Sequence, residues 1–302
     1  MRVFVAGGSG TIGVPLVRAL VAAGHDVTAL TRSIGKRTDL LALGASVAVA
    51  DALDRPALAA AVAAASPTHV IHQLTALPKD GPRKAGDITA TNRLRVEGTR
   101  NLLDAAVAAG ARRFVAGSFA LLAPRDSSAG APSNDAAAAV AAMEDQVLRA
   151  SARGLVEGVV LRYGMFYGPG TPSTRAMIDL VRQRRLPVVR DDRGRLPLVH
   201  LDDAVAATVL ALDAGPAGAV YDIVDDRAVS MTEIAETLAA HTGAPRPFRV
   251  PAWLPRLVAP YLAGIMSIQM PLSNDRAKAG LGWRPRYPTM EDGMAAMFRR
   301  VA

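Results

Sequence analysis

Cysteine is absent from this 302-residue chain, and aromatic residues make up only 4% of it. The absence of cysteine excludes disulfides and thiolate metal sites, so we expect a reducing cytoplasm as its setting. The formal net charge is +8, yet only four residues are lysine and none of them forms a basic run. Few aromatics and no basic run argue against a nucleic-acid partner.

Long uninterrupted hydrophobic segments are also missing. The most apolar late stretch, residues 250–272, contains four prolines and an arginine. A spanning helix needs about 20 consecutive apolar residues with a satisfied helical backbone. The N-terminus offers no secretory signal, because Met1 and Arg2 lead at once into a four-residue apolar run and then glycines. We therefore expect neither a membrane segment nor secretion.

What is present is a regular alternation of apolar runs and helical patterns. Alternation with short connections is typical of a parallel sheet covered by helices on both faces. We predict a Rossmann-type, doubly wound parallel α/β sheet with a smaller, mainly helical C-terminal substrate lobe. The expected division is residues 1–165, with 200–230 returning to the sheet domain, against 166–199 and 231–302 for the lobe. Strands are expected at 3–6, 27–30, 47–49, 69–74, 113–116 and 156–161, and helices at 13–23, 56–65, 92–109, 135–152, 174–185, 202–212, 232–240 and 290–300, with a loop at 127–133.

A glycine-rich turn joins the first strand to the first helix. Its three glycines have the spacing G-x-x-G-x-x-G over residues 7–13. Such a turn lets the backbone approach a pyrophosphate and places a helix N-terminus against its charge. The sequence therefore predicts a dinucleotide site whose loop contacts come from Gly7, Ser9, Gly10, Thr11 and Ile12.

The end of the second strand indicates which dinucleotide is bound. Arg32 stands where an acidic residue would accept a hydrogen bond from the ribose of NAD. A guanidinium suits the 2′-phosphate of NADP instead, so we predict NADP(H) as the cofactor. Asp51 and Ala52 follow the third strand and are expected near the adenine. Leu74, Thr75 and Ala76 follow the fourth strand and are expected along the cofactor groove.

The glycine loop and several further segments match one superfamily in order and spacing. The further segments include Glu97–Leu103, Leu161–Gly164 with Tyr167–Gly170, Val199–Ala204 and Leu281–Pro285. On these the chain resembles the extended short-chain dehydrogenases/reductases, close to proteins called NAD-dependent epimerases/dehydratases. The resemblance covers nearly the whole length and implies the Rossmann fold and oxidoreductase chemistry.

The chain departs from that superfamily at its catalytic triad. The resemblance implies a Ser or Thr together with Tyr-x-x-x-Lys, but no tyrosine here is followed by a lysine four residues later. Aligning Glu144 with the usual downstream glutamate puts Ala136 and Val140 at the Tyr and Lys positions. Phe119 falls at the Ser/Thr position, with Ser118 beside it. A sugar-nucleotide epimerase, which needs that tyrosine, is therefore disfavoured.

Ketone reduction is less demanding, because the cofactor supplies the hydride and the substrate or water can supply the proton. The chain is similar to atypical polyketide ketoreductases that lack the triad. That resemblance implies an NADPH-dependent ketoreductase, acting on an aromatic polyketide in antibiotic biosynthesis, as a monomer or homodimer. A non-catalytic NADP sensor or regulator, and an isomerase or cyclase on the same scaffold, stay as alternatives.

The remaining candidates lie around the expected nicotinamide position. Ser118 is the nearest hydroxyl and either contacts the substrate oxygen or caps the strand end. Phe119, Phe166, Tyr261 and Met266 are expected to line the substrate pocket, although ordinary lobe packing explains them equally well.

Two histidines are the other candidates for chemistry. His72 lies in an apolar strand and is interpreted as core. His200 with Asp202 and Asp203 is interpreted as a strand-to-helix cap, so no metal site is expected.

Overall fold

The main sheet is built from short apolar strands that are buried on both faces. The structure, a computed structural model, describes residues 1–78, 85–124, 135–190, 192–251, 253–254, 269–270 and 272–299. The sheet consists of β1 (Arg2–Ala6), β2 (Asp26–Thr31), β3 (Ser46–Val49), β4 (His69–His72), β5 (Arg113–Phe119), β6 (Glu157–Tyr163) and β10 (Ala219–Ile223). Their order is β10-β6-β5-β4-β1-β2-β3, with every neighbouring pair parallel. The predicted fold class is confirmed.

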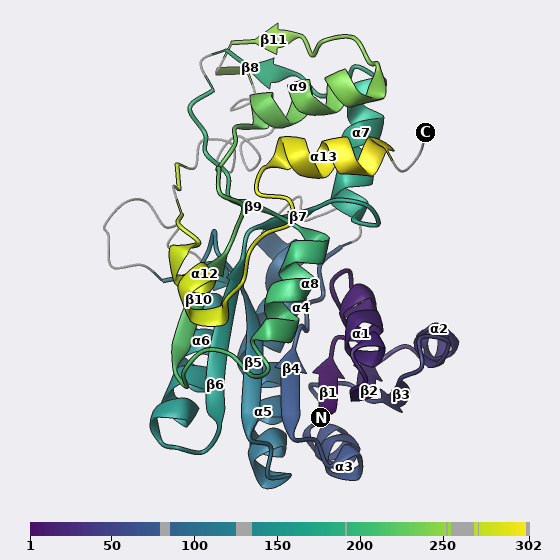
Figure 1. Ribbon diagram of the computed structural model, residues 1–302, viewed down its shortest axis with the longest axis vertical. Helices are drawn as coiled ribbons and strands as arrows, with labels where there is room; N and C mark the ends of the chain where they lie inside the picture. Colours follow the sequence, from purple (N-terminus) through teal and green to yellow (C-terminus); the bar gives the residue numbers. More distant parts are fainter. Residues whose placement is uncertain are drawn as a thin grey trace.

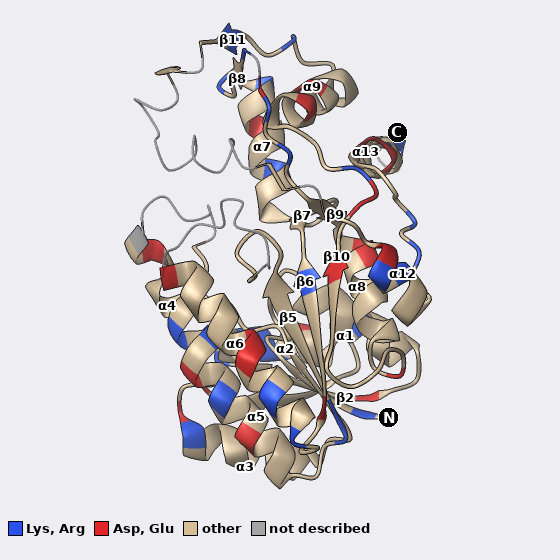
Figure 2. Ribbon diagram, turned by 90° about the vertical axis from the view of Figure 1, so that its left-hand side faces the viewer, with Lys and Arg blue, Asp and Glu red and all other residues tan. Residues whose placement is uncertain are grey.

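Helices cover both faces of this sheet. Figure 2 shows α3, α5 and α6 on one face and α1, α8 and α12 on the other. Each face has its own apolar cluster, which explains why the strands read as continuous hydrophobic runs. The described helices are α1 (Gly13–Ala22), α2 (Arg37–Leu41), α3 (Arg55–Ala65), α4 (Thr89–Arg93), α5 (Thr99–Ala108), α6 (Asp135–Ala152), α7 (Pro172–Arg182), α8 (Leu201–Leu210), α9 (Met231–Thr242), α12 (Asp275–Leu281) and α13 (Met290–Arg299).

The fourth strand is shorter than expected. We predicted residues 69–74, but β4 ends at His72. The backbone N–H of Gln73 still donates to the Ala6 carbonyl at 2.8 Å, whereas that of Leu74 donates to Nδ1 of the His72 side chain at 3.2 Å. The chain therefore leaves the sheet at this point and opens its carboxyl edge for the loop that follows.

The chain returns to the sheet late in the sequence. β10 pairs with β6, and α8 packs against α1 on the same face. The strand β10 carries alternating buried and half-buried residues over only five positions. We had expected residues 200–230 to return to the sheet, without identifying a strand there. The division of the chain into a domain and a lobe at the stated residues stays a prediction.

A smaller region lies beyond the carboxyl ends of the parallel strands (Figure 1). It contains α7, α9 and α13 around an apolar cluster that includes Leu196, Leu238 and Met294. Four strands of two or three residues, which we did not predict, pair there: β7 (Met165–Tyr167) with β9 (Leu198–His200), and β8 (Val188–Val189) with β11 (Arg249–Val250). Among the described helices, none has the length and apolar character needed to cross a membrane.

A buried carboxylate stands where β10 leads into this region. Asp225 is 3% exposed, and neither of its carboxylate oxygens makes a hydrogen bond within the described part of the chain. Burial raises the pKa of Asp225 well above its ordinary value, and the nearby carboxylates of Asp203 and Asp226 raise it further. The Tyr167 hydroxyl and the His200 backbone N–H lower the pKa of Asp225 by more than either neighbouring carboxylate raises it, but by less than burial does.

We predict that Asp225→Asn stabilises the protein at pH 8. Because the folded pKa lies above the unfolded one, the contribution of Asp225 to stability is full below the unfolded pKa and is lost as pH rises. Removing the buried charge is expected to raise the free energy of unfolding by about 1 kcal/mol at pH 8. Urea titrations at pH 8 and pH 4.5 should show the difference shrinking at the lower pH. A variant less stable than the wild type at pH 8 would contradict this assignment.

Candidate functional site

The glycine loop is held in place by very close backbone contacts. Gly7 has φ +90°, and a Cβ built on it would lie 2.5 Å from the carbonyl oxygen of Gln73. A Cβ on Gly13, the first residue of α1, would lie 2.1 Å from the carbonyl oxygen of Gly7. Only glycine fits at these two positions, so the loop after β1, the loop after β4 and the start of α1 are pressed together.

The resulting helix N-terminus suits an anion. The α1 N-terminus has no side-chain cap and no acidic residue in its first turn within the described residues. Its first backbone N–H groups therefore have no competing side-chain acceptor. A Cβ on Gly10 would meet only the Gly7 carbonyl oxygen, at 3.2 Å. Position 10 is therefore less tightly packed than positions 7 and 13, which fits a backbone surface that a bound pyrophosphate can approach.

Arg32 and Asp51 stand at the neighbouring strand ends. The hydroxyls of Ser9 and Thr31 lie 3.0 Å apart, which ties the glycine loop to the end of β2. Arg32 follows directly and is exposed. Asp51 is exposed and accepts the Leu53 backbone N–H at 2.9 Å. These positions match those expected beside the ribose and the adenine, and their roles stay predictions.

The loop after β4 completes the same edge of the sheet. Leu74 and Ala76 are half-buried and Thr75 is exposed. The backbone N–H of Ala76 donates to the Thr91 hydroxyl at 2.9 Å, which fixes the loop over α4. Together with the glycine loop, these residues form a continuous backbone rim along the carboxyl edge. The rim fits a dinucleotide, which when bound supplies hydride chemistry at its nicotinamide end.

Ser118 belongs to a buried ionic network on the α6 face of β5. Its hydroxyl donates to Glu144 Oε1 at 2.5 Å. The Glu144 carboxylate also receives Arg162, with Nη2 to Oε2 at 2.6 Å and Nε to Oε1 at 3.0 Å. A hydroxyl whose hydrogen is bound to Glu144 can only accept from a substrate, so the predicted contact with a substrate oxygen requires this bond to rearrange. That role stays a prediction.

The helix face expected to carry the triad is apolar near the site. Ala136 and Val140 are 3% and 0% exposed and lie on the buried face of α6, about two turns and one turn, respectively, before Glu144. Neither side chain carries a polar group. The positions that the superfamily uses for tyrosine and lysine therefore offer no proton here.

Two tyrosines near the carboxyl ends of the strands, Tyr163 and Tyr167, have hydrogen-bond partners within the protein. The Tyr163 hydroxyl lies 2.9 Å from Gln73 Nε2 and 2.7 Å from the Thr208 hydroxyl. Burial raises the pKa of Tyr163 to about 12, the opposite of what a nearby ammonium would do. Burial also raises the pKa of Tyr167, whose hydroxyl donates to the Thr289 carbonyl at 3.1 Å.

Two of the four expected pocket residues lie at the carboxyl edge. Phe119, at the end of β5, and Phe166, in β7, are both half-buried. The Phe166 ring centre lies 5.3 Å from that of Tyr163. Tyr261 and Met266 lie outside the described residues. Whether either phenylalanine contacts substrate stays a prediction.

Both histidine interpretations agree with the geometry. His72 is fully buried: Nδ1 accepts the Leu74 backbone N–H, so Nε2 carries the proton toward the Thr99 hydroxyl, 2.8 Å away. Burial lowers the pKa of His72 to about 4, so the ring is neutral and structural. His200 Nδ1 accepts the Asp202 backbone N–H and caps α8, as expected.

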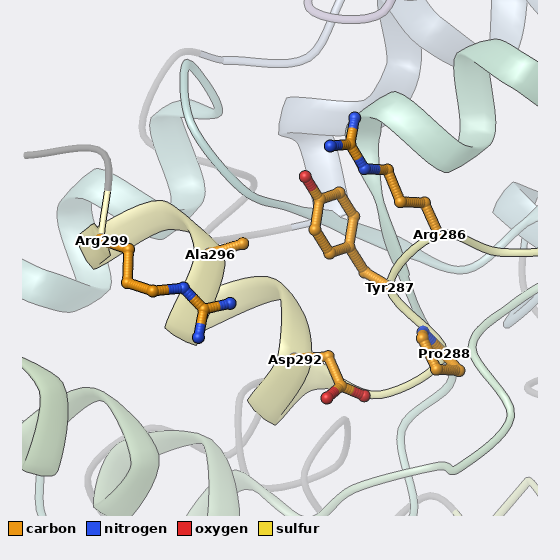
Figure 3. Close-up of a pocket in the computed structure, with 6 residues that line it drawn as sticks. All are labelled: Arg286, Tyr287, Pro288, Asp292, Ala296 and Arg299. Carbon is orange, nitrogen blue, oxygen red and sulfur yellow. The ribbon is translucent and has the colours of Figure 1, made fainter.

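A hollow of about 490 Å³ lies away from this rim, between residues 286–288 and α13. Figure 3 shows Arg286 and Arg299 on opposite sides of it, with Asp292 below. None of the predicted cofactor residues lines this hollow. The candidate site is therefore the rim, where the close glycine contacts and the uncapped N-terminus of α1 suit a bound pyrophosphate.

Sequence reasoning missed two arginines that are largely buried, Arg95 and Arg162. Arg162 was recognised only as part of a motif, and Arg95 was not singled out at all. Arg95 is 9% exposed and lies in a π-helical turn, Leu94–Gly98, between α4 and α5. The signal in the sequence was a second arginine, two residues after Arg93, inside a helical pattern whose buried face should be apolar.

We predict opposite consequences for two glycine substitutions in the loop. Gly13→Ala places a methyl group against backbone that cannot move away, and should destabilise the protein by about 1–3 kcal/mol. Gly10→Ala should lower the melting temperature less than Gly13→Ala, because its closest contact is 3.2 Å, but should lower NADPH affinity at least about tenfold, since the pyrophosphate needs close approach of the backbone there. Thermal denaturation and NADPH fluorescence titration measure both effects. Equal affinities for Gly10→Ala and wild type would contradict the placement of the site.

Comparison with known proteins agrees with this geometry. Residues 3–224 match the model of the NAD dependent epimerase/dehydratase family. The chain is 41% identical to a 3-diazoavenalumate denitrifying reductase from a Streptomyces species, over 97% of this chain and 99% of the relative. It is 28% identical to a 4-hydroxy-2-methyl-3-oxo-4-farnesyl-3,4-dihydroquinoline-1-oxide ketoreductase from Stigmatella aurantiaca, over 98% and 96%.

Solved structures share the fold of this chain. UDP-glucose 4-epimerase from Thermotoga maritima superposes with a TM-score of 0.81 at 19% identity, over 100% of this chain and 98% of that one. At that identity the likeness concerns the fold alone. The family match covers more than two thirds of the sequence and includes the glycine loop and β10. The chain is an oxidoreductase that belongs to the NAD-dependent epimerase/dehydratase family.

Proposed function

We propose that this protein is an NADPH-dependent ketoreductase whose substrate is an aromatic polyketide of the angucyclinone type. In this proposal the polypeptide contributes no proton, which comes from the substrate or from water. The observation that carries it is the apolar face of α6, where Ala136 and Val140 replace the acid and its cationic partner. The relatives named as reductases support hydride chemistry in preference to a regulator or a cyclase.

An aromatic polyketide suits a site of this kind. A phenol placed peri to the ketone can pass its proton to the oxygen that becomes an alkoxide. A positioned general acid contributes about 10²–10⁴-fold to a rate, so a substrate carrying its own acid recovers most of that factor. The protein then needs only to orient the ring and exclude water.

A second candidate follows from the 41% identical relative, whose name describes reduction and removal of nitrogen from a diazo compound. Transfer of a hydride to an aryl diazonium group forms a C–H bond and releases N₂. The C–N bond breaks as the C–H bond forms, so atoms and charge balance without an added proton. Such a reaction would need no tyrosine at all, so the apolar α6 face favours it as well.

For the cofactor, we predict that Arg32→Ala weakens NADPH binding about tenfold or more and leaves NADH binding nearly unchanged. The reason is the loss of a charge-assisted contact to the 2′-phosphate, worth about 1.5–3 kcal/mol. Arg37→Ala, another exposed arginine nearby, is the matched control and should change neither affinity. Equal losses for NADPH and NADH in Arg32→Ala would refute the 2′-phosphate role.

For the reaction, we predict that a peri-hydroxy angucyclinone ketone is reduced and that its phenol methyl ether is reduced about 10²–10⁴-fold more slowly, because the ether has no proton to give. NADPH deuterated at the transferred position should label the carbinol carbon. With a diazo phenol, the label would enter the ring as one N₂ is released per NADPH. Equal rates for the phenol and the ether would contradict a substrate-borne acid. An enzyme that reduces neither the ketones nor the diazo phenols would contradict the proposed function.

A further inference from the structure

Arg95 is a buried cation in an unusual backbone conformation. It is 9% exposed and belongs to the π-helical turn Leu94–Gly98, which interrupts the helix between α4 and α5. Single π-turns are rare and occur frequently at functional sites. The wider turn also changes the direction in which residue 95 projects compared with a regular helix. Both features indicate that the Arg95 guanidinium has a specific binding partner.

Arg113, the other buried arginine of the described residues, and the half-buried Arg162 have partners that Arg95 lacks. Arg162 is held by the Glu144 carboxylate, and Arg113 pairs with Glu157 at 3.1 Å and donates to the Ala211 carbonyl at 2.8 Å. For Arg95 the described residues provide one acceptor, Asn92 Oδ1, at 3.3 Å from Nη1, and no carboxylate. A guanidinium has five N–H donors, and a buried charge without a counter-ion is costly.

The charge persists at neutral pH and lies close to the site. Burial lowers the pKa of Arg95 to about 10, so the side chain remains protonated under physiological conditions. Arg95 also lies near enough to His72, at the carboxyl end of β4, to lower its pKa. The π-turn packs against α6, the helix that carries Ala136 and Val140. The hydrogen bond from Gln146 Nε2 to the Val96 carbonyl, at 3.2 Å, fixes this contact two residues after Glu144, so the Arg95 charge lies between the carboxyl end of β4 and the α6 helix.

From this placement we propose that Arg95 is the fixed positive charge of the active site and that it binds a negatively charged oxygen of the substrate. The inference rests on the proposed function. When hydride adds to the ketone carbon, its C=O π-bond breaks and an alkoxide forms. The peri phenol gives its proton to that alkoxide and becomes a phenolate, which a neighbouring guanidinium stabilises. A diazo phenol carries the same oxyanion.

The test measures the ionisation of a bound phenol directly, without turnover. Alizarin, a hydroxyanthraquinone whose colour changes on ionisation, is titrated with pH in complex with the enzyme saturated with NADP⁺. An opposite charge within about 4–6 Å lowers an acid's pKa by about 1–3 units, so in Arg95→Gln the bound dye should ionise at a pH at least about one unit higher than in wild type. Arg95→Lys keeps the charge and should stay near wild type.

Two controls separate this role from the others. Arg93→Gln, on an exposed arginine of α4 that pairs with Glu97, should not move the dye's ionisation. NADPH affinity, measured by fluorescence, should change less than about threefold in Arg95→Gln, and its melting temperature should not fall, since an unpartnered charge has been removed.

The outcomes are distinct. An unmoved dye titration with a tenfold or greater loss of NADPH affinity would assign the guanidinium to the cofactor and overturn the proposal. An unmoved titration with a lower melting temperature would make it structural, and failure of wild type to bind the dye would also overturn it. A shifted titration in an enzyme that reduces neither substrate class would uphold the anion site and reject the proposed function.

Discussion

The contact between the Gly13 α-carbon and the Gly7 carbonyl sets the geometry on which the rest of the site depends. With no room for a methyl group between them, the first turn of α1 is pressed onto the end of β1. Gly7 in turn lies against the backbone of Gln73, which brings in the loop after β4. Three segments far apart in sequence thus form one rim of backbone at the carboxyl edge, where an open α/β sheet binds its ligands.

Beyond that rim, the chemistry is shaped by where polar groups are buried. Glu144 on α6 accepts hydrogen bonds from Ser118 and Arg162, which ties this helix to β5 and β6. Tyr163, near the same edge, is held by Gln73 and Thr208 with a raised pKa. The hydrogen bonds of both groups are therefore made to neighbouring protein side chains. This arrangement is consistent with the proposal that the substrate carries its own acid–base function.

Sequence reasoning succeeded where one physical signal dominates. Continuous apolar runs and the glycine spacing determined the parallel sheet, because strands buried on both faces leave no other pattern. It failed where the signal is short or non-local. The two-residue strands β8 and β11 are fixed by packing in the C-terminal region, and β4 ends early because the His72 ring takes the next backbone N–H. The isolation of Arg95 is invisible in sequence, since it depends on which acceptors the fold leaves out of reach.

The pH dependence of kcat across a series of substrates tests most directly whether the substrate, and not a protein side chain, donates the proton to the alkoxide. The series consists of angucyclinone ketones whose peri phenols carry substituents that raise or lower their acidity. If the substrate is the acid, the pH at which the rate falls moves with the phenol's own pKa from one substrate to the next. If the break stays at one pH for every substrate, a protein side chain is donating the proton, and the substrate-borne acid is ruled out.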